Sequence, residues 1–368
     1  MHDIDPISEG IIDFAILGGD GYGESICVHL GQYKWGIIDT FIEREKNMPA
    51  ALVYLELLGQ DFESVQFIQI THHHNDHNGG LKVLIEECPN AKIFLPDIFD
   101  GETFHTLIRN PIINWNKKNR LYELAQAIKY VDSIEGRYCE YSKQDSPIHV
   151  SDFNDDVKIK VYAVSPNNYT KDYFLKKIGK RTEAYNVLLK GFKPNLTSVA
   201  VLITIGSLSY LMTADLEITD NNNTGLFSIL ESIELKDKCC IIFKIPHHGS
   251  ENGFRDGSIW DSLICNNDSV LVCTPFNRLA ESKKLPVKEM QKKITDKFPN
   301  SYITSNPRRT FKNIHSEVET KRLLRKFGKQ TIPLINDFGI VRLRSEINSE
   351  DIKIDLYGKA QHLSDLMS

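Results

Sequence analysis

Residues 71–77 of the chain read Thr71-His72-His73-His74-Asn75-Asp76-His77. The segment directly before them, residues 65–70, is rich in β-branched and aromatic residues, which predicts a buried strand. On a loop that leaves a strand, His72 and His74 can point the same way because alternate residues do. Asp76 and His77, on the turn that follows, can face a second point nearby. The stretch therefore predicts a loop able to hold two metal ions.

The types of side chain in this loop restrict the metal. Imidazole and carboxylate groups without a thiolate suit Zn²⁺, Mn²⁺ or iron, and among these we expect two divalent ions, with Zn²⁺ favoured and Mn²⁺ as the alternative. Neither half of the loop offers four protein ligands, so each ion keeps room for water, which is typical of a catalytic site. The side chain of His73 is expected to point away from its neighbours and to take no part.

Other polar residues follow runs that read as strands. Asp39 ends the run of residues 36–39, and Asp215 ends the run of residues 211–215. Residues 240–245 read as a strand and lead into the pentapeptide Pro246-His247-His248-Gly249-Ser250. The sequence thus repeats one pattern, a strand that ends at a potential metal ligand.

These residues carry a resemblance to a known family. The spacing His72-x-His74-x-Asp76-His77 matches the HxHxDH signature of the metallo-β-lactamase fold. The resemblance implies an α/β protein, an αββα sandwich of two mixed β-sheets with helices on the outside and the metals at one edge. It also implies that Asp39 supports the metal loop and that Asp215 bridges both metals. The terminal ligand is His247 or His248, and we favour His248.

A narrower resemblance rests on three shorter stretches. They are Gly21-Tyr22-Gly23-Glu24-Ser25, Asn195-x-Thr197-Ser198-Val199 and the pentapeptide at residues 246–250. All three are similar to the soluble hydrolase domain attached to ComEC DNA-uptake proteins. This likeness implies a role in processing nucleic acid.

The sequence departs from the family pattern at two places. The family has a further histidine between the loop and the bridging aspartate, but residues 151–246 contain none. We expect His72, His74 and Asp215 to hold the first metal more weakly, helped by water, Asn195 or Ser198. The second departure is Ala214 in place of glycine, which is expected to be tolerated with a negative φ.

The expected chemistry is hydrolysis by a metal-bound hydroxide. Asp76 or Asp215 would orient the hydroxide and take its proton, while His247, as the histidine that is not a ligand, would donate a proton to the leaving group. The sequence lacks the GxSxG stretch of a serine hydrolase, and no Lys-Ser/Thr pair follows the glycines at residues 18–23, which excludes a phosphate-binding loop.

Three functions stay open from the sequence. The leading hypothesis is a phosphodiesterase or nuclease that acts on nucleic acid, supported by basic residues at 306–329 and by Lys176, Lys177, Lys180 and Arg181. The alternatives are a hydrolase of a small ester, lactone or phosphorylcholine-like substrate, and a metal-poor, non-catalytic binding subunit. Both basic segments could instead be ordinary solvated helix faces.

Composition supports a folded protein without a membrane span. The 368 residues are 41% hydrophobic and 25% charged, and the net charge of −5 provides no global attraction for nucleic acid. No apolar run reaches the length that a membrane span needs, and the first residues lack the pattern of a signal peptide, so a cytoplasmic location is the default. Seven scattered cysteines without a CxxC pair argue against a disulfide framework and are expected to be small core residues.

We expect one metallo-β-lactamase-like domain over residues 1–368. Two helix-leaning insertions, at about 98–150 and 167–194, are expected to wall the site and to set its specificity.

Overall fold

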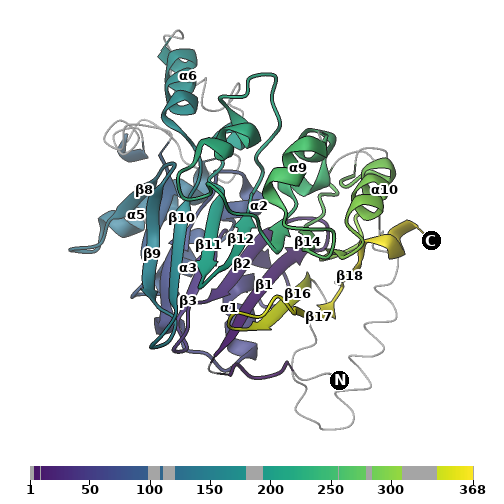
Figure 1. Cartoon of the computed structure of the whole chain (residues 1–368). Coiled ribbons are helices and arrows are strands. Elements are labelled where there is room, and N and C mark those ends of the chain that lie inside the picture. Colours follow the sequence, from purple (N-terminus) through teal and green to yellow (C-terminus); the bar gives the residue numbers. More distant parts are fainter. Residues whose placement is uncertain are drawn as a thin grey trace.

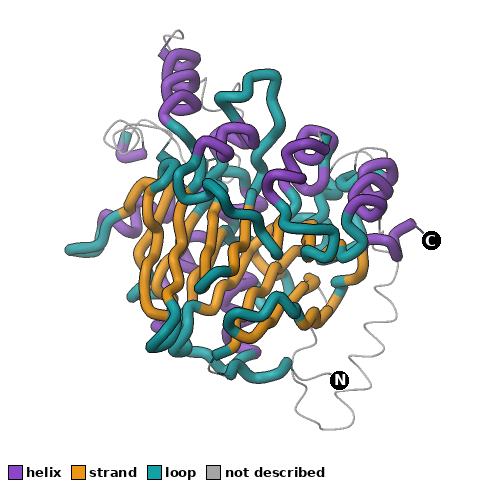
Figure 2. The backbone as a smooth tube through the Cα atoms, viewed as in Figure 1, coloured by secondary structure: helices purple, strands orange, loops and turns teal. Residues whose placement is uncertain are grey.

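The computed structural model describes residues 4–8, 10–97, 108–110, 121–179, 194–255, 257–278, 284–308 and 338–367. Two eight-stranded sheets make up the centre of the described part of the chain. Figure 2 shows the strands gathered in the middle, with helices outside them.

The first sheet begins with a meander. Strands β1 (Ile11–Gly19), β2 (Glu24–His29) and β3 (Trp35–Ile38) pair antiparallel. The sheet continues in parallel through β6 (Val65–Gln69), β7 (Lys92–Pro96) and β8 (Cys139–Ser142). On the other side of β1, the sheet is completed by β16 (Phe338–Glu346) and β17 (Lys353–Gly358).

The second sheet has an antiparallel and a parallel half. Its antiparallel half consists of β9 (Ser146–Asp152), β10 (Lys158–Ala163) and the hairpin of β11 (Val201–Ile205) and β12 (Leu208–Met212). The parallel half continues from β12 through β13 (Ile242–Lys244), β14 (Val270–Cys273) and β15 (Ser301–Ile303), and the short β18 (Gln361–His362) lies at the edge.

Alternation along the strands assigns the faces of both sheets. Phe14 and Ile16 of β1 pack in the cluster between the sheets, whereas Ala15 and Leu17 pack in the cluster on the outer face. Helices α1 (Ala50–Leu57), α3 (Leu81–Glu87) and α5 (Tyr122–Asp132) belong to that outer cluster. The outer face of the second sheet packs against the 3-10 helix η3 (Gly225–Glu231) and helices α9 (Gly257–Leu263) and α10 (Lys288–Lys297). The predicted αββα sandwich is confirmed (Figure 1).

The shorter helices connect these layers. They are η1 (Phe62–Ser64), α2 (Asn75–Asn78), η2 (Pro194–Thr197), η4 (Pro246–Gly249), α8 (Glu251–Phe254) and η6 (Leu363–Met367). A separate two-stranded sheet pairs β4 (Ile42–Glu43) with β5 (Met48–Pro49). Of these elements, α2 and η4 carry the histidines that the sequence singles out.

The first expected insertion is only partly an insertion. Within about 98–150, α5 is helical, but β8 and β9 are the edge strands of the two sheets, so this portion completes the sandwich. The second expected insertion contains α6 (Asn168–Gly179), which projects from the sheets at the top of Figure 1. Residues 98–107, 111–120 and 180–193 lie outside the described residues, as does most of the basic segment at 306–329. The expectation of a single domain remains a prediction.

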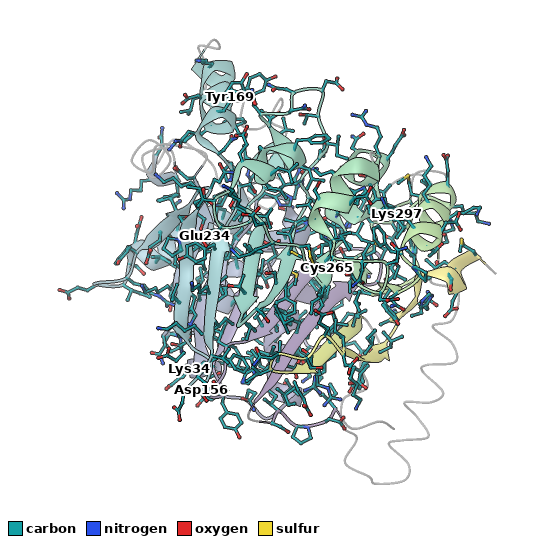
Figure 3. All side chains as sticks on the ribbon, in the orientation of Figure 1. Lys34, Asp156, Tyr169, Glu234, Cys265 and Lys297 are labelled. Carbon is teal, nitrogen blue, oxygen red and sulfur yellow. A yellow bond between two sulfur atoms is a disulfide. The ribbon has the colours of Figure 1, made fainter. Side chains whose placement is uncertain are left out.

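The cysteines follow the expectation only in part. Cys27, Cys88, Cys240 and Cys273 are buried core residues, as predicted. Cys239 and Cys265, however, form a disulfide with 4.8 Å between their Cα atoms (Figure 3, Cys265 labelled). The sequence missed this bond because the two residues are 26 positions apart and meet only through folding, in the isolated bridge between residues 240 and 264. No helix among the described residues is both long and apolar enough to cross a membrane.

Candidate metal centre

The candidate site lies where the parallel strands of both sheets end. Asp39 follows β3 and the histidine loop follows β6, and these two strands are parallel neighbours in the first sheet. Asp215 follows β12 and the histidine pair follows β13, and these are parallel neighbours in the second sheet. Neighbouring parallel strands present their carboxyl ends at the same edge, and loops at such an edge commonly form ligand sites.

Two groups of three side chains meet at this edge. We call His72, His74 and Asp215 the first half-site, and Asp76, His77 and His248 the second half-site. Within each group the potential ligand atoms all lie within 4.8 Å of one another. A third such group combines His77 and Asp215 with Glu24 of β2.

Asp215 contacts both half-sites. Its Oδ2 atom lies 3.7 Å from Nε2 of His72 and 3.4 Å from Nε2 of His248. Its Oδ1 atom lies 3.4 Å from Nε2 of His77. The geometry fits the bridging position that the sequence resemblance implies for this carboxylate.

Asp39 orients the histidine loop from behind. Its Oδ2 atom lies 2.7 Å from Nδ1 of His77, and the same atom accepts a hydrogen bond of 2.6 Å from the hydroxyl of Thr71. Because that hydroxyl donates to Asp39, it accepts from Nδ1 of His72, which lies 3.0 Å away. One buried carboxylate therefore fixes both rings so that each Nε2 faces Asp215, an arrangement typical of the outer shell of metal sites.

The structure separates the roles of the two paired histidines. Nδ1 of His248 lies 3.0 Å from the carbonyl oxygen of Thr274 and donates to it, which leaves Nε2 facing Asp76 at 3.3 Å. Of the pair, it is His248 that belongs to a half-site, and its role as the ligand remains a prediction. His247 instead has both ring nitrogens in contact with polar neighbours: Nε2 lies 3.1 Å from the Asn195 amide, and Nδ1 lies 2.9 Å from the Ser250 hydroxyl.

The backbone of the histidine pair is unusual. His247, His248 and Gly249 have φ values of 45°, 54° and 68°, so three successive residues are left-handed. A non-glycine residue in this region costs on the order of 1–3 kcal/mol and persists only where the surroundings enforce it, most often at functional sites. The conformation supports a functional rather than a merely structural turn.

The expectation for Ala214 is wrong. Its φ is +48°, not negative, so the residue adopts the left-handed conformation that glycine would adopt without strain. Its carbonyl oxygen accepts hydrogen bonds from Nζ of Lys244 at 3.2 Å and from the backbone N–H of His247 at 3.1 Å. Tertiary contacts thus hold a backbone conformation that the sequence alone does not favour.

The polar atoms that face one another fit a divalent cation. Nε2 of His77, Nε2 of His248 and Oδ1 of Asp215 are buried and make no hydrogen bond with the described residues. Buried polar atoms are almost always satisfied, so three unsatisfied atoms at one point indicate a missing partner. Nitrogen and carboxylate oxygen are the ligands of Zn²⁺ and Mn²⁺.

The pKa values support this fit. Burial alone would raise the pKa of Asp215, but His248 and His77 outweigh burial and hold it well below its ordinary value. Burial keeps the pKa of His72 well below its usual range, so this ring stays neutral and able to coordinate. Burial would also lower the pKa of His248, but Asp215 and Asp76 raise it to about 9. The carboxylates are therefore charged and attract a cation. Protons and metal ions compete for the same ligand atoms.

Both half-sites open into a cleft of about 430 Å³. Its wall includes Tyr22, Phe276 and Arg278, together with His247 and His73. His73 belongs to neither half-site, as predicted for a bystander, although its side chain does line the cleft.

A positive charge stands at the mouth of the cleft. The exposed guanidinium of Arg278 lies 3.3 Å from the centre of the Tyr22 ring, and it pairs with no carboxylate among the described residues. Inside the cleft, Phe276 stacks on His248 with ring centres 5.3 Å apart. The cleft therefore combines a cationic edge with an aromatic wall.

Sequence reasoning missed several residues that shape the site. Glu24 was noted only as part of a resemblance, and Thr274 and Lys244 were not noted at all. Lys244 carried a detectable signal, because a lysine stands inside the apolar run of residues 240–245 directly before the histidine pair. A charged residue in a buried strand is rare unless it has a partner.

Residues 28–98 match the family model of the metallo-beta-lactamase superfamily. The matched segment includes Asp39 and the histidine loop. The match is confined to this segment, and the two sheets with helices outside them have the αββα arrangement that the resemblance to this superfamily implies.

Solved structures of metallo-beta-lactamases are similar to the chain at low sequence identity. The Rm3 metallo-beta-lactamase is 14% identical, with 67% of this chain and 79% of that chain covered and a TM-score of 0.35. A HARLDQ-motif mutant of a metallo-beta-lactamase from Cronobacter sakazakii is 14% identical, with 68% and 86% covered and a TM-score of 0.34. MEM-A1, a subclass B3 metallo-beta-lactamase from a soil metagenome library, is 12% identical, with 70% and 88% covered and a TM-score of 0.34. No curated protein matches the chain.

Proposed function

We propose that the protein is a dinuclear metal-dependent hydrolase of phosphodiesters, with nucleic acid as the substrate class. One observation carries the hydrolase proposal: two half-sites share Asp215 at the floor of an open cleft. The superfamily of residues 28–98 supports it.

The residues of the chain divide the work as follows. His72, His74 and Asp215 would hold one ion, and Asp76, His77, His248 and Asp215 would hold the other. Two divalent ions at these positions would activate water and stabilise the charge that develops on the attacked group. Asp76 or Asp215 accepts the proton of the attacking water. Asn195 and Ser198 each have a buried oxygen that makes no hydrogen bond to the described residues, so both remain candidates to complete the first half-site.

His247 is proposed to pass a proton to the leaving group. It lines the cleft, and its side chain is 21% exposed, so a substrate can reach it. Its Nδ1 lies 3.4 Å from the carboxylate of Glu217, which would stabilise the ring in its protonated form. Because Asn195 contacts Nε2, the substrate has to displace that amide before the transfer.

Arg278 supports an anionic substrate. A guanidinium that has no carboxylate partner among the described residues suits a phosphate oxygen, which it can bind by charge-assisted hydrogen bonds. The resemblance to the hydrolase domain of ComEC proteins favours nucleic acid among phosphodiesters, and a cytoplasmic location agrees with that role.

The test combines metal analysis with an activity assay. Elemental analysis of the purified protein should find close to two metals per chain, and bis(p-nitrophenyl) phosphate should be hydrolysed. The double variant Asp76→Ala/His77→Ala should lose at least one metal and the activity while keeping its circular dichroism spectrum. If no metal binds after reconstitution with Zn²⁺ and Mn²⁺, the proposal is wrong and a binding subunit becomes the better description.

The substrate class needs a second measurement. Binding of single-stranded or duplex DNA should weaken steeply between about 50 and 200 mM salt, because each phosphate contact releases counterions. Turnover of a small ester or lactone should change little over that range. Hydrolysis of such an ester without any phosphodiesterase activity would replace our substrate class with the small-ester alternative, for which Phe276 and Leu285 provide apolar walls.

A further inference from the structure

We propose that Lys244 is a positioning residue that holds the backbone bend at Ala214 and so presents Asp215 to both half-sites. The inference rests on the proposed metal centre and extends it to a residue that contacts no substrate. It explains why a lysine is buried in the middle of a sheet.

Lys244 is the last residue of β13, and its side chain is fully buried. Nζ lies 2.6 Å from Oε2 of Glu24, whose side chain is 1% exposed. The same Nζ donates to the carbonyl oxygen of Ala214 at 3.2 Å. Removing two charges from water costs several kcal/mol per ion, and the attraction within a buried pair often fails to repay it. The pair is therefore poorly explained by stability alone.

The bond to Ala214 gives the lysine a specific task. Ala214 has a φ of +48° directly before Asp215, a conformation that is strained for a residue with a side chain. A second bond to the same carbonyl, from the N–H of His247, links this bend to the histidine pair. Two donors on one carbonyl fix the peptide plane between Ala214 and Asp215. The direction in which the Asp215 side chain leaves the backbone is thereby fixed as well.

Glu24 extends the network to the second half-site. Its Oε2 also accepts a hydrogen bond of 2.6 Å from the hydroxyl of Thr274, and the carbonyl of Thr274 accepts from His248. The chain of contacts thus joins the ends of β12, β13 and β14 to β2 of the opposite sheet. A shift of the lysine would move Asp215 and His248 together.

A simpler explanation is that Lys244 only neutralises Glu24. The two explanations differ for a variant that removes both charges: neutralisation predicts native metal binding, whereas positioning predicts a loss. They also differ at Ala214, since a glycine there adopts a positive φ without help from a lysine.

The experiment compares the double variant Lys244→Met/Glu24→Gln with the triple variant that adds Ala214→Gly. We measure Co²⁺ affinity and the visible Co²⁺ spectrum, which reports ligand geometry, and the thermal midpoint of the metal-free protein. We expect the double variant to bind Co²⁺ about 10–100-fold more weakly with an altered spectrum, as for other outer-shell changes. The triple variant should recover most of the affinity and the native spectrum.

A matched control removes another buried pair. Arg342 and Asp13, fully buried in the first sheet, form an ion pair of 2.5 Å, and neither residue lines the cleft or belongs to a half-site. The variant Arg342→Met/Asp13→Asn should lower the thermal midpoint but leave Co²⁺ affinity unchanged.

Each outcome decides the question. Native affinity in the double variant, or a loss that Ala214→Gly does not repair, overturns the positioning role while the metal centre stands. A wild-type protein that binds no metal overturns the proposed function as well. If the double variant fails to fold, a triple variant that folds and binds Co²⁺ supports positioning, and a triple variant that also fails to fold refutes it.

Discussion

The two half-sites differ in their number of potential ligands and in how firmly their histidine rings are held. The second half-site has Asp76, His77 and His248, with Asp215 beside them, and both of its histidines are anchored from behind, by Asp39 and by Thr274. The first half-site has only His72, His74 and Asp215.

Of its histidines, only His72 is anchored, through Thr71. Nδ1 of His74 lies 3.1 Å from Nε2 of His72, and no residue in the described part of the chain anchors the His74 ring from behind. From this difference we expect the second half-site to hold an ion more tightly than the first, because oriented ligands lose less freedom on binding.

Replacing Asp215, which contacts both half-sites, should weaken metal binding at both and so remove the difference between them. We expect Asp215→Ala to reduce metal content from about two to fewer than one per chain and to lower kcat/KM by more than about 100-fold, since both half-sites lose a ligand. Elemental analysis after desalting measures the first effect and phosphodiester hydrolysis measures the second. If one full equivalent of metal remained, Asp215 would not bridge the half-sites.

Replacing His74 of the first half-site should show that the two half-sites differ in metal binding. We expect His74→Ala to keep about one metal per chain and to lose most of the activity, because the second half-site is intact. The control is His73→Ala in the same loop, which belongs to neither half-site and should keep both metals. Loss of both metals in His74→Ala would show that the half-sites are not independent.

Replacing Asp39, which orients His72 and His77 from behind, should lower the metal affinity of both half-sites, but by less than Asp215→Ala does. Asp39 contacts His77 directly and His72 through Thr71, so Asp39→Asn should lower affinity at both by about 10–100-fold. A chelator titration followed by elemental analysis checks this, because the midpoints of both release steps should shift to lower chelator concentration. A shift in only one step would confine the anchor to one half-site.

The sequence indicated the residues of the two half-sites better than the residues that hold them in place. The histidine loop, Asp215 and His248 could be found because each follows a strand-like run, and the ends of parallel strands meet in space. The left-handed backbone of Ala214 and the Lys244–Glu24 pair could not, because they depend on contacts between the two sheets. Two edge strands, β8 and β9, were also missed because their short, mixed sequences lack a clean alternation.

The smallest effect on activity should come from a residue outside both half-sites. Arg278 lies at the mouth of the cleft and in neither half-site, so Arg278→Ala should leave metal content and kcat unchanged. If the substrate is anionic, KM for a phosphodiester should rise about five- to tenfold, since a charge-assisted hydrogen bond contributes about 1.5–3 kcal/mol and the exposed position reduces it. Arg255→Ala, which removes a half-exposed arginine that pairs with Asp220, is the matched control. An unchanged KM in Arg278→Ala would remove the main structural support for an anionic substrate and leave the metal centre untouched.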